Sequence, residues 1–192
     1  MTADGLKWHP VIDVLKYGPE KAQHVTDVLG REPKHEDFLA LGIEPDDTAH
    51  SEGNQLVTVG LDRLGKLITG QSTTAFTSAQ GIVGVGSGTT AWAATQTALA
   101  GDGSTSSAYY QIADAAPSAS NGVISANCTY QSGNANFSWN EWCWIIATGT
   151  ITAGGTLASV GTSPVMLNRK VQSLGTKANG SIWTLSAVIT LS

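Results

Sequence analysis

Charged side chains are scarce in this sequence of 192 residues, because Asp, Glu, Lys and Arg make up only 13% of it. Ten Lys and Arg stand against fifteen Asp and Glu, which gives a net charge of −5. A nucleic-acid partner requires clustered Lys and Arg that displace counterions from the phosphate backbone. Runs of about 18 apolar residues, the length that crosses a membrane, are also missing. We therefore expect neither a nucleic-acid nor a membrane partner, and a protein made in the cytoplasm.

Cysteine and histidine are too few or too scattered for a metal site. Cys128 and Cys143 lack the spacing of metal ligands and are expected to be reduced. The four His residues are eleven to fifteen positions apart and form no HExxH motif. The densest group of donors, residues 35–37 (His-Glu-Asp), is typical of a solvated helix start, with metal binding as the alternative. The sequence predicts no metal and no cofactor.

Catalytic side chains are rare in the last two thirds of the chain. Residues 67–192 contain no His and only three acidic residues, Asp102, Asp114 and Glu141. Ordinary hydrolysis requires a nucleophile beside a base, or two carboxylates in a cleft. We therefore expect no enzymatic activity and assign no catalytic residue, with a site shared between the two ends of the chain as the alternative.

The glycine-rich stretch 81–90 (GIVGVGSGTT) superficially resembles a phosphate-binding loop. It lacks the Lys of a Walker loop and the strand-helix-strand context of a dinucleotide loop. The more economical interpretation is a strand that enters a tight turn.

Most of the charged residues lie in the N-terminal third of the sequence. Residues 1–66 hold seven of the ten Lys and Arg, twelve of the fifteen Asp and Glu, and all four His. Four prolines cut the first 50 residues into short pieces, with helices possible at 21–29 and 35–41. The segment is nevertheless too apolar for a disordered tail. We predict an extended N-terminal arm over 1–53 that orders against a partner, followed by a body over 54–192.

The body carries the signals of a mainly β fold. Helical spacing of apolar residues predicts a helix over 54–69, and an Ala-rich stretch suggests a second over 90–99. Strand-like segments separated by Gly, Asn, Ser and Pro follow at 81–86, 108–113, 123–130, 135–146, 165–174 and 182–191. This pattern predicts an antiparallel β-sandwich or jelly-roll-like body.

The densest aromatic segment is 137–146 (FSWNEWCWII). Strand alternation would place Trp139 and Glu141 on one face and Asn140, Trp142 and Trp144 on the other. We expect both faces to be covered, one by the core and the other by a subunit, the arm or another sheet. A platform on which exposed tryptophans stack on sugars is the alternative.

Glu141 cannot be buried on such a strand as a lone charge. The body offers only Arg169, Lys170 and Lys177 as cations. We predict a Glu141–Arg169 ion pair that fixes strand register, because a guanidinium matches a carboxylate with two hydrogen bonds.

The candidate interface or structural residues combine aromatic side chains of the arm with the polar and aromatic centre of the body. They are Trp8, Tyr17, Phe38, Trp139, Asn140, Glu141, Trp142, Trp144 and Arg169.

The order of several motifs resembles a family of structural proteins from tailed-bacteriophage virions. These motifs are Gly84–Ala91, Ala94–Leu99, Phe137–Trp142, Met166–Lys170, Leu174–Lys177 and Trp183–Leu185. The resemblance covers residue 55 to the end and implies a β-sandwich module of the phage particle without enzymatic activity.

This resemblance leaves two functions open. The first is a capsid decoration, or cement, protein that binds the outer capsid surface through its arm and stabilises it. Its partners would be the major capsid protein and copies of itself, with a trimer expected by analogy. The alternative is a minor tail or tail-fibre component that recognises host glycans. In both, the chain is assembled in the bacterial cytoplasm and resides in the virion.

Overall fold

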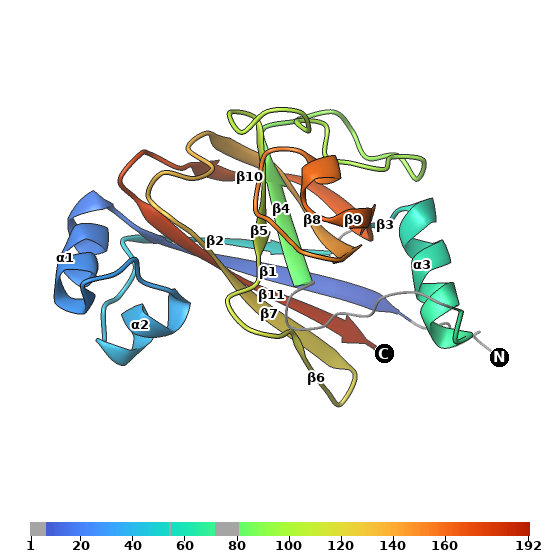
Figure 1. The fold of residues 1–192 in the computed structure, drawn as a ribbon, viewed down its shortest axis with the longest axis horizontal. Coiled ribbons are helices and arrows are strands. Elements are labelled where there is room, and N and C mark those ends of the chain that lie inside the picture. The colour runs from blue at the N-terminus through green and yellow to red at the C-terminus, as the bar shows by residue number, and fades with distance from the viewer. Residues whose placement is uncertain (1–6, 54, 72–80) are drawn as a thin grey trace.

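Two antiparallel β-sheets pack face to face in the computed structural model of the chain, which describes residues 7–53, 55–71 and 81–192 (Figure 1). This confirms the predicted mainly β sandwich with a few short helices. Residues 1–6 of the predicted arm and Asn54 at the start of the predicted helix lie outside the described residues.

The first sheet has five strands in the order β2-β1-β11-β7-β6. Their bounds are Asp47–Glu52 for β2, Trp8–Tyr17 for β1, Ile182–Leu191 for β11, Val123–Tyr130 for β7 and Ser118–Ser120 for β6. Strands from the two ends of the sequence therefore lie next to each other, because β1 and β11 pair along the full length of both.

The second sheet has six strands in the order β3-β10-β8-β4-β5, with β9 also paired to β8. Their bounds are Gln55–Leu56 for β3, Asn168–Thr176 for β10, Ser138–Thr148 for β8, Gly81–Gly86 for β4, Ala108–Ile112 for β5 and Thr162–Met166 for β9. The segment predicted as one strand over 165–174 is two strands, which pair with different stretches of β8.

Helices lie at both ends of the sandwich (Figure 1). Helices α1 (Pro19–Leu29) and α2 (His35–Ala40) pack at one end, and α3 (Thr58–Ile68) lies at the other. A short 3-10 helix spans Leu157–Ser159. The second predicted body helix, over 90–99, is instead an irregular loop in which the Gln96 side chain bonds the backbone of Ala91 and Ala93.

The N-terminal segment differs from the predicted extended arm. In its described part, β1 is an inner strand between β2 and β11. Ile12 and Val14 are fully buried while Asp13 is exposed, which is the alternation of a half-buried strand. Pro10 lies within β1 opposite Ile189, just before the stretch paired with β2, and Pro19 begins α1, so neither proline breaks its element.

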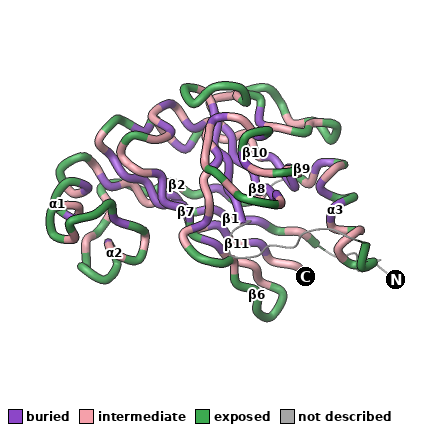
Figure 2. The backbone as a smooth tube through the Cα atoms, in the orientation of Figure 1, coloured by how far each residue is buried: buried purple, intermediate pink, exposed green. Residues whose placement is uncertain are grey.

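The main core lies between the sheets, where buried positions run along the inner strands (Figure 2). A second apolar cluster covers the outer face of the second sheet, with Ile82, Tyr110 and Ile145 packed under residues of the 87–107 and 149–161 loops. As a result, β8 contains seven consecutive buried residues, from Glu141 to Ala147. The prediction that both faces of this strand are covered is confirmed, and the outer cover is the chain's own loops.

A buried cation follows the end of β10. The Lys177 side chain is 1% exposed, and its Nζ donates hydrogen bonds to the Gln131 carbonyl at 2.9 Å and to Asn136 Oδ1 at 2.8 Å. No carboxylate within the described residues pairs with it. Burial lowers the pKa of Lys177 to about 8, because a charged ammonium loses its hydration there.

This lowered pKa predicts that Lys177 stabilises the folded state increasingly as pH rises. Above pH 8 the unfolded chain holds a proton on Lys177 that the folded chain has lost, so the free energy of unfolding of wild type should rise by about 2 kcal/mol relative to that of Lys177→Met between pH 7.5 and 9.5. The comparison is needed because the buried thiols of Cys128 and Cys143, whose pKa values burial raises, lower the stability of both proteins over the same range. Urea unfolding measures the difference, and wild type should show no such rise relative to Lys66→Met, a control on the exposed face of α3. Parallel pH profiles of wild type and Lys177→Met would contradict the assignment.

Candidate functional site

The predicted ion pair between Glu141 and Arg169 is confirmed at the centre of the second sheet. Arg169 Nε donates to Glu141 Oε2 at 2.5 Å, and both side chains are 0% exposed. Only one guanidinium nitrogen reaches the carboxylate, which corrects the predicted two-bond geometry. The other two nitrogens donate to Gln96 Oε1 and to the Thr90 carbonyl, each at 3.0 Å, so the guanidinium also binds the 87–101 loop.

Backbone amides supply the remaining hydrogen bonds of the buried carboxylate. Glu141 Oε1 accepts from the N–H groups of Gly88 at 3.1 Å and Gly101 at 2.8 Å. Oε2 accepts from the N–H of Ala100 at 3.0 Å. A buried carboxylate is tolerated only with a cation and hydrogen-bond donors around it, and Glu141 has both.

Two of the four glycines in the glycine-rich segment make room for this carboxylate. A Cβ atom on Gly86 would lie 2.5 Å from Glu141 Oε1, and one on Gly88 would lie 2.4 Å from it. Only glycine leaves room for the carboxylate to approach the backbone. The segment that resembles a phosphate-binding loop thus helps to bind an anion, and the anion is a side chain of the same protein.

The three tryptophans of β8 are structural. Trp139, Trp142 and Trp144 are fully buried and belong to one core cluster between the sheets. This corrects the predicted alternation, which put Trp139 on the opposite face. The β8–β10 pairing shifts register between Val171 and Gly175, next to Trp139 and Glu141, and such irregularities re-aim side chains. With no exposed ring surface, these three residues cannot form the sugar-stacking platform considered as the alternative.

The other candidate residues lie in three places. Asn140 lies beside the ion pair and donates to the Ser87 carbonyl at 3.2 Å. Tyr17 stacks on Phe38 with ring centroids 3.8 Å apart, in the small core that joins α1 and α2 to the first sheet. Trp8 is half-buried against the main core. The structure therefore groups six of the nine residues in β8 and β10, and it places Trp8, Tyr17 and Phe38 elsewhere.

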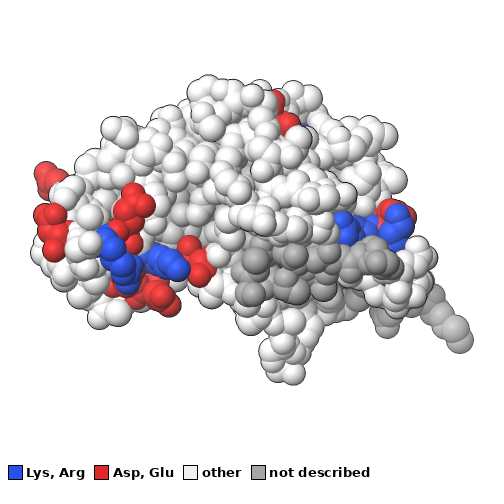
Figure 3. Space-filling view, in the orientation of Figure 1, with Lys and Arg blue, Asp and Glu red and all other residues white. Residues whose placement is uncertain are grey.

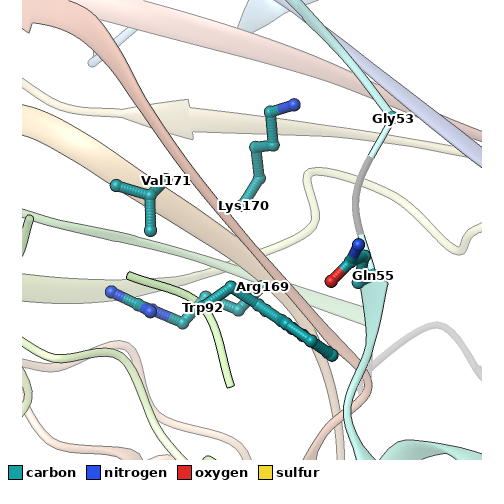
Figure 4. A pocket seen from close by; sticks show the side chains of 6 residues that line it. All are labelled: Gly53, Gln55, Trp92, Arg169, Lys170 and Val171. Carbon is teal, nitrogen blue, oxygen red and sulfur yellow. The ribbon is translucent and has the colours of Figure 1, made fainter. Parts of the chain in front are cut away.

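An open cavity of about 490 Å³ lies beside the edge strand β3 and the neighbouring strand β10 (Figure 4). It is lined by Gly53, Gln55, Trp92, Arg169, Lys170 and Val171. The sequence did not predict that Trp92 and Lys170 lie close together, because they come from a loop and a strand that are far apart in the sequence. The one local indication of a site was a lone Trp in a loop made mostly of small residues.

Other titratable or reactive side chains make structural contacts. His35 Nδ1 lies 2.9 Å from Thr184 Oγ1, and burial lowers the pKa of this imidazole. Cys128 and Cys143 are buried free thiols, as predicted. Among the described residues, no group of three or more His, Cys, Asp or Glu is placed to hold a metal ion, and no helix is long and apolar enough to cross a membrane.

Comparisons with protein-family models, with curated proteins and with solved structures find no match to this chain. The resemblance to phage virion proteins therefore stays an expectation from sequence motifs.

Removal of the guanidinium should destabilise the fold strongly. Arg169→Ala leaves the buried Glu141 carboxylate without its cation, so we expect a loss of about 3 to 5 kcal/mol in the free energy of unfolding. Lys170→Ala, which removes the neighbouring and partly exposed cation, is the matched control and should cost less than about 1 kcal/mol. Equal losses in the two variants, measured by urea unfolding, would show that the ion pair has no special role.

A methyl group at Gly88 should have a similar but smaller effect. Gly88→Ala would push the Glu141 carboxylate away from its amide donors, and overpacking of this kind costs about 1 to 3 kcal/mol. Gly133→Ala is the control, since a Cβ there meets nothing within 4 Å. Unfolding of both variants at the same urea concentration would contradict the close approach of Glu141 to Gly88.

Proposed function

We propose that this chain is a non-enzymatic structural protein of a tailed-phage virion that decorates the outer surface of the capsid. The motif order over residues 55–192 supports the virion assignment. The observation that favours a capsid-binding role is the concentration of net negative charge at one end of the molecule, around three exposed apolar side chains.

The segment 18–47, named here the α1–α2 lobe, contains eight Asp or Glu and three Lys or Arg. Its net charge of −5 equals that of the whole chain, because the remaining residues hold seven of each sign. Figure 3 shows charged side chains over this end and near α3, with an almost uncharged surface between them. Ion pairs join Lys21 to Asp46 and Arg31 to Asp37, but most carboxylates of the lobe have no cation partner within the described residues.

The same lobe exposes three large apolar side chains. Val28 is 56% exposed, Leu39 60% and Leu41 43%. Apolar side chains set among charges are typical of surfaces that bind other proteins, where charge selects the partner. Since the N-terminal segment is built into the first sheet, we assign the capsid contact to this lobe in place of an extended arm. The partners are the major capsid protein and further copies of the chain, with a trimer as the expected oligomer.

The alternative is a minor tail or tail-fibre component that recognises host glycans. The tryptophans of β8 do not support it, since they are buried. The cavity beside Trp92 is the one observation that favours it.

The copy number per virion tests the proposal. Quantitative mass spectrometry of purified particles should find hundreds of copies, as a decorated capsid lattice requires. A handful of copies would indicate the tail instead, and absence from the particle would refute both virion functions.

The capsid contact assigned to the α1–α2 lobe is tested separately, by the capsid occupancy of variants. Leu39→Lys should reduce capsid occupancy at least tenfold without a change in melting temperature, because a charge replaces an apolar contact. Leu61→Lys is the matched control, since Leu61 is 55% exposed on α3 at the opposite end. Equal occupancy by the two variants would refute the role of the lobe.

A further inference from the structure

We propose that the cavity lined by Gln55, Trp92 and Lys170 binds an acidic saccharide unit, such as a sugar that carries a carboxylate. This ligand site goes beyond the capsid-binding role and lies on residues that the α1–α2 lobe does not contain. Its volume of about 490 Å³ falls within the roughly 300–1,000 Å³ of small-molecule sites.

The wall that carries Trp92 is held in place by the buried ion pair. Thr90, two residues before Trp92, accepts a hydrogen bond from Arg169, and Gln96, four residues after it, accepts another. Glu141 fixes the two ends of the same loop through Gly88 and Gly101. A binding surface that is already ordered loses little conformational entropy when a ligand binds.

Trp92 gives the cavity an aromatic surface. Its side chain is only partly buried and lines the open space (Figure 4), unlike the three tryptophans of β8. An indole ring packs well against the C–H face of a sugar ring. The indole Nε1 is shielded from solvent, so a ligand in the cavity would contact the ring and not this N–H.

The charge of the lining favours an anion. None of the described residues that line the cavity is Asp or Glu, although the chain as a whole has a net charge of −5. Arg169 is neutralised by Glu141. Lys170 Nζ donates to the Glu52 carbonyl at 3.2 Å and forms no ion pair within the described ranges, so two of the three ammonium donors are available. The Gln55 side chain adds an amide that both donates and accepts, as recognition of hydroxyl groups requires.

A nucleotide also combines a ring with an anion, but the cavity suits it less. Phosphate recognition relies on several backbone N–H groups or cations around the oxygens. In the 87–101 loop, the amides of Gly88, Ala100 and Gly101 already donate to Glu141. A phosphate, which requires several donors, would therefore find only the ammonium group of Lys170. A single ammonium group is sufficient to bind one carboxylate.

Titration with three probes tests the ligand class. We expect 3′-sialyllactose to shift the indole N–H resonance of Trp92 in a nitrogen-15 correlation spectrum, with saturation at millimolar concentration or below. Neutral lactose should bind at least fivefold more weakly, and uridine monophosphate more weakly than 3′-sialyllactose. No shift with any probe, or tighter binding of the nucleotide, would overturn the proposal.

Variants locate the binding within the cavity. Trp92→Ala should weaken 3′-sialyllactose binding at least tenfold, with the Lys170 resonances as the readout, and Trp92→Phe should restore part of the affinity. Lys170→Gln should remove the preference for the acidic sugar over lactose, while Lys66→Gln, on α3, should leave it unchanged. Affinity that survives both cavity substitutions would refute the site.

The capsid-binding proposal and the saccharide-binding proposal can be refuted independently of each other. Trp92→Ala should occupy capsids as wild type does, because Trp92 lies outside the α1–α2 lobe. Loss of saccharide binding with capsid occupancy retained is the expected outcome. Loss of both in this variant, with an unchanged melting temperature, would contradict the separation of the two surfaces.

Discussion

The buried carboxylate of Glu141 is the constraint on which most of the second sheet depends. It joins three parts of the chain, because it accepts from Arg169 on β10 and from backbone amides at both ends of the 87–101 loop. Desolvation of a lone carboxylate is so costly that these donors must all be in place when the strand is buried. One side chain therefore couples strand register to the position of a covering loop.

That coupling explains why a sandwich of modest size has a sheet buried on both faces. The loop covers an outer apolar layer that includes Tyr110 and Ile145, which would otherwise face water. The charged and polar groups of Glu141 and Arg169 therefore serve the structure of the second sheet. The two surfaces to which we assign binding, the α1–α2 lobe and the cavity beside Trp92, are made of different residues.

Much of this framework could be predicted from the sequence, because alternation and turn residues are local signals. The strands at 81–86, 123–130 and 182–191 have the predicted bounds, and the Glu141–Arg169 pair followed from the scarcity of cations in the body. The strand β1 was missed because prolines suggested broken pieces, while its place depends on pairing with β11 at the other end of the chain. The role of Gly86 and Gly88 was equally hidden, since it is defined by a carboxylate more than 50 residues away.

Hydrogen exchange at the amides of Gly88, Ala100 and Gly101 tests the central claim most directly. These amides lie in a loop, where exchange is ordinarily fast, yet each donates to the Glu141 carboxylate. The account predicts protection close to that of the core strand β8 in the wild type, and selective loss of protection at these three positions in Glu141→Gln. Fast exchange of the three amides in the wild type, beside a protected β8, would contradict it.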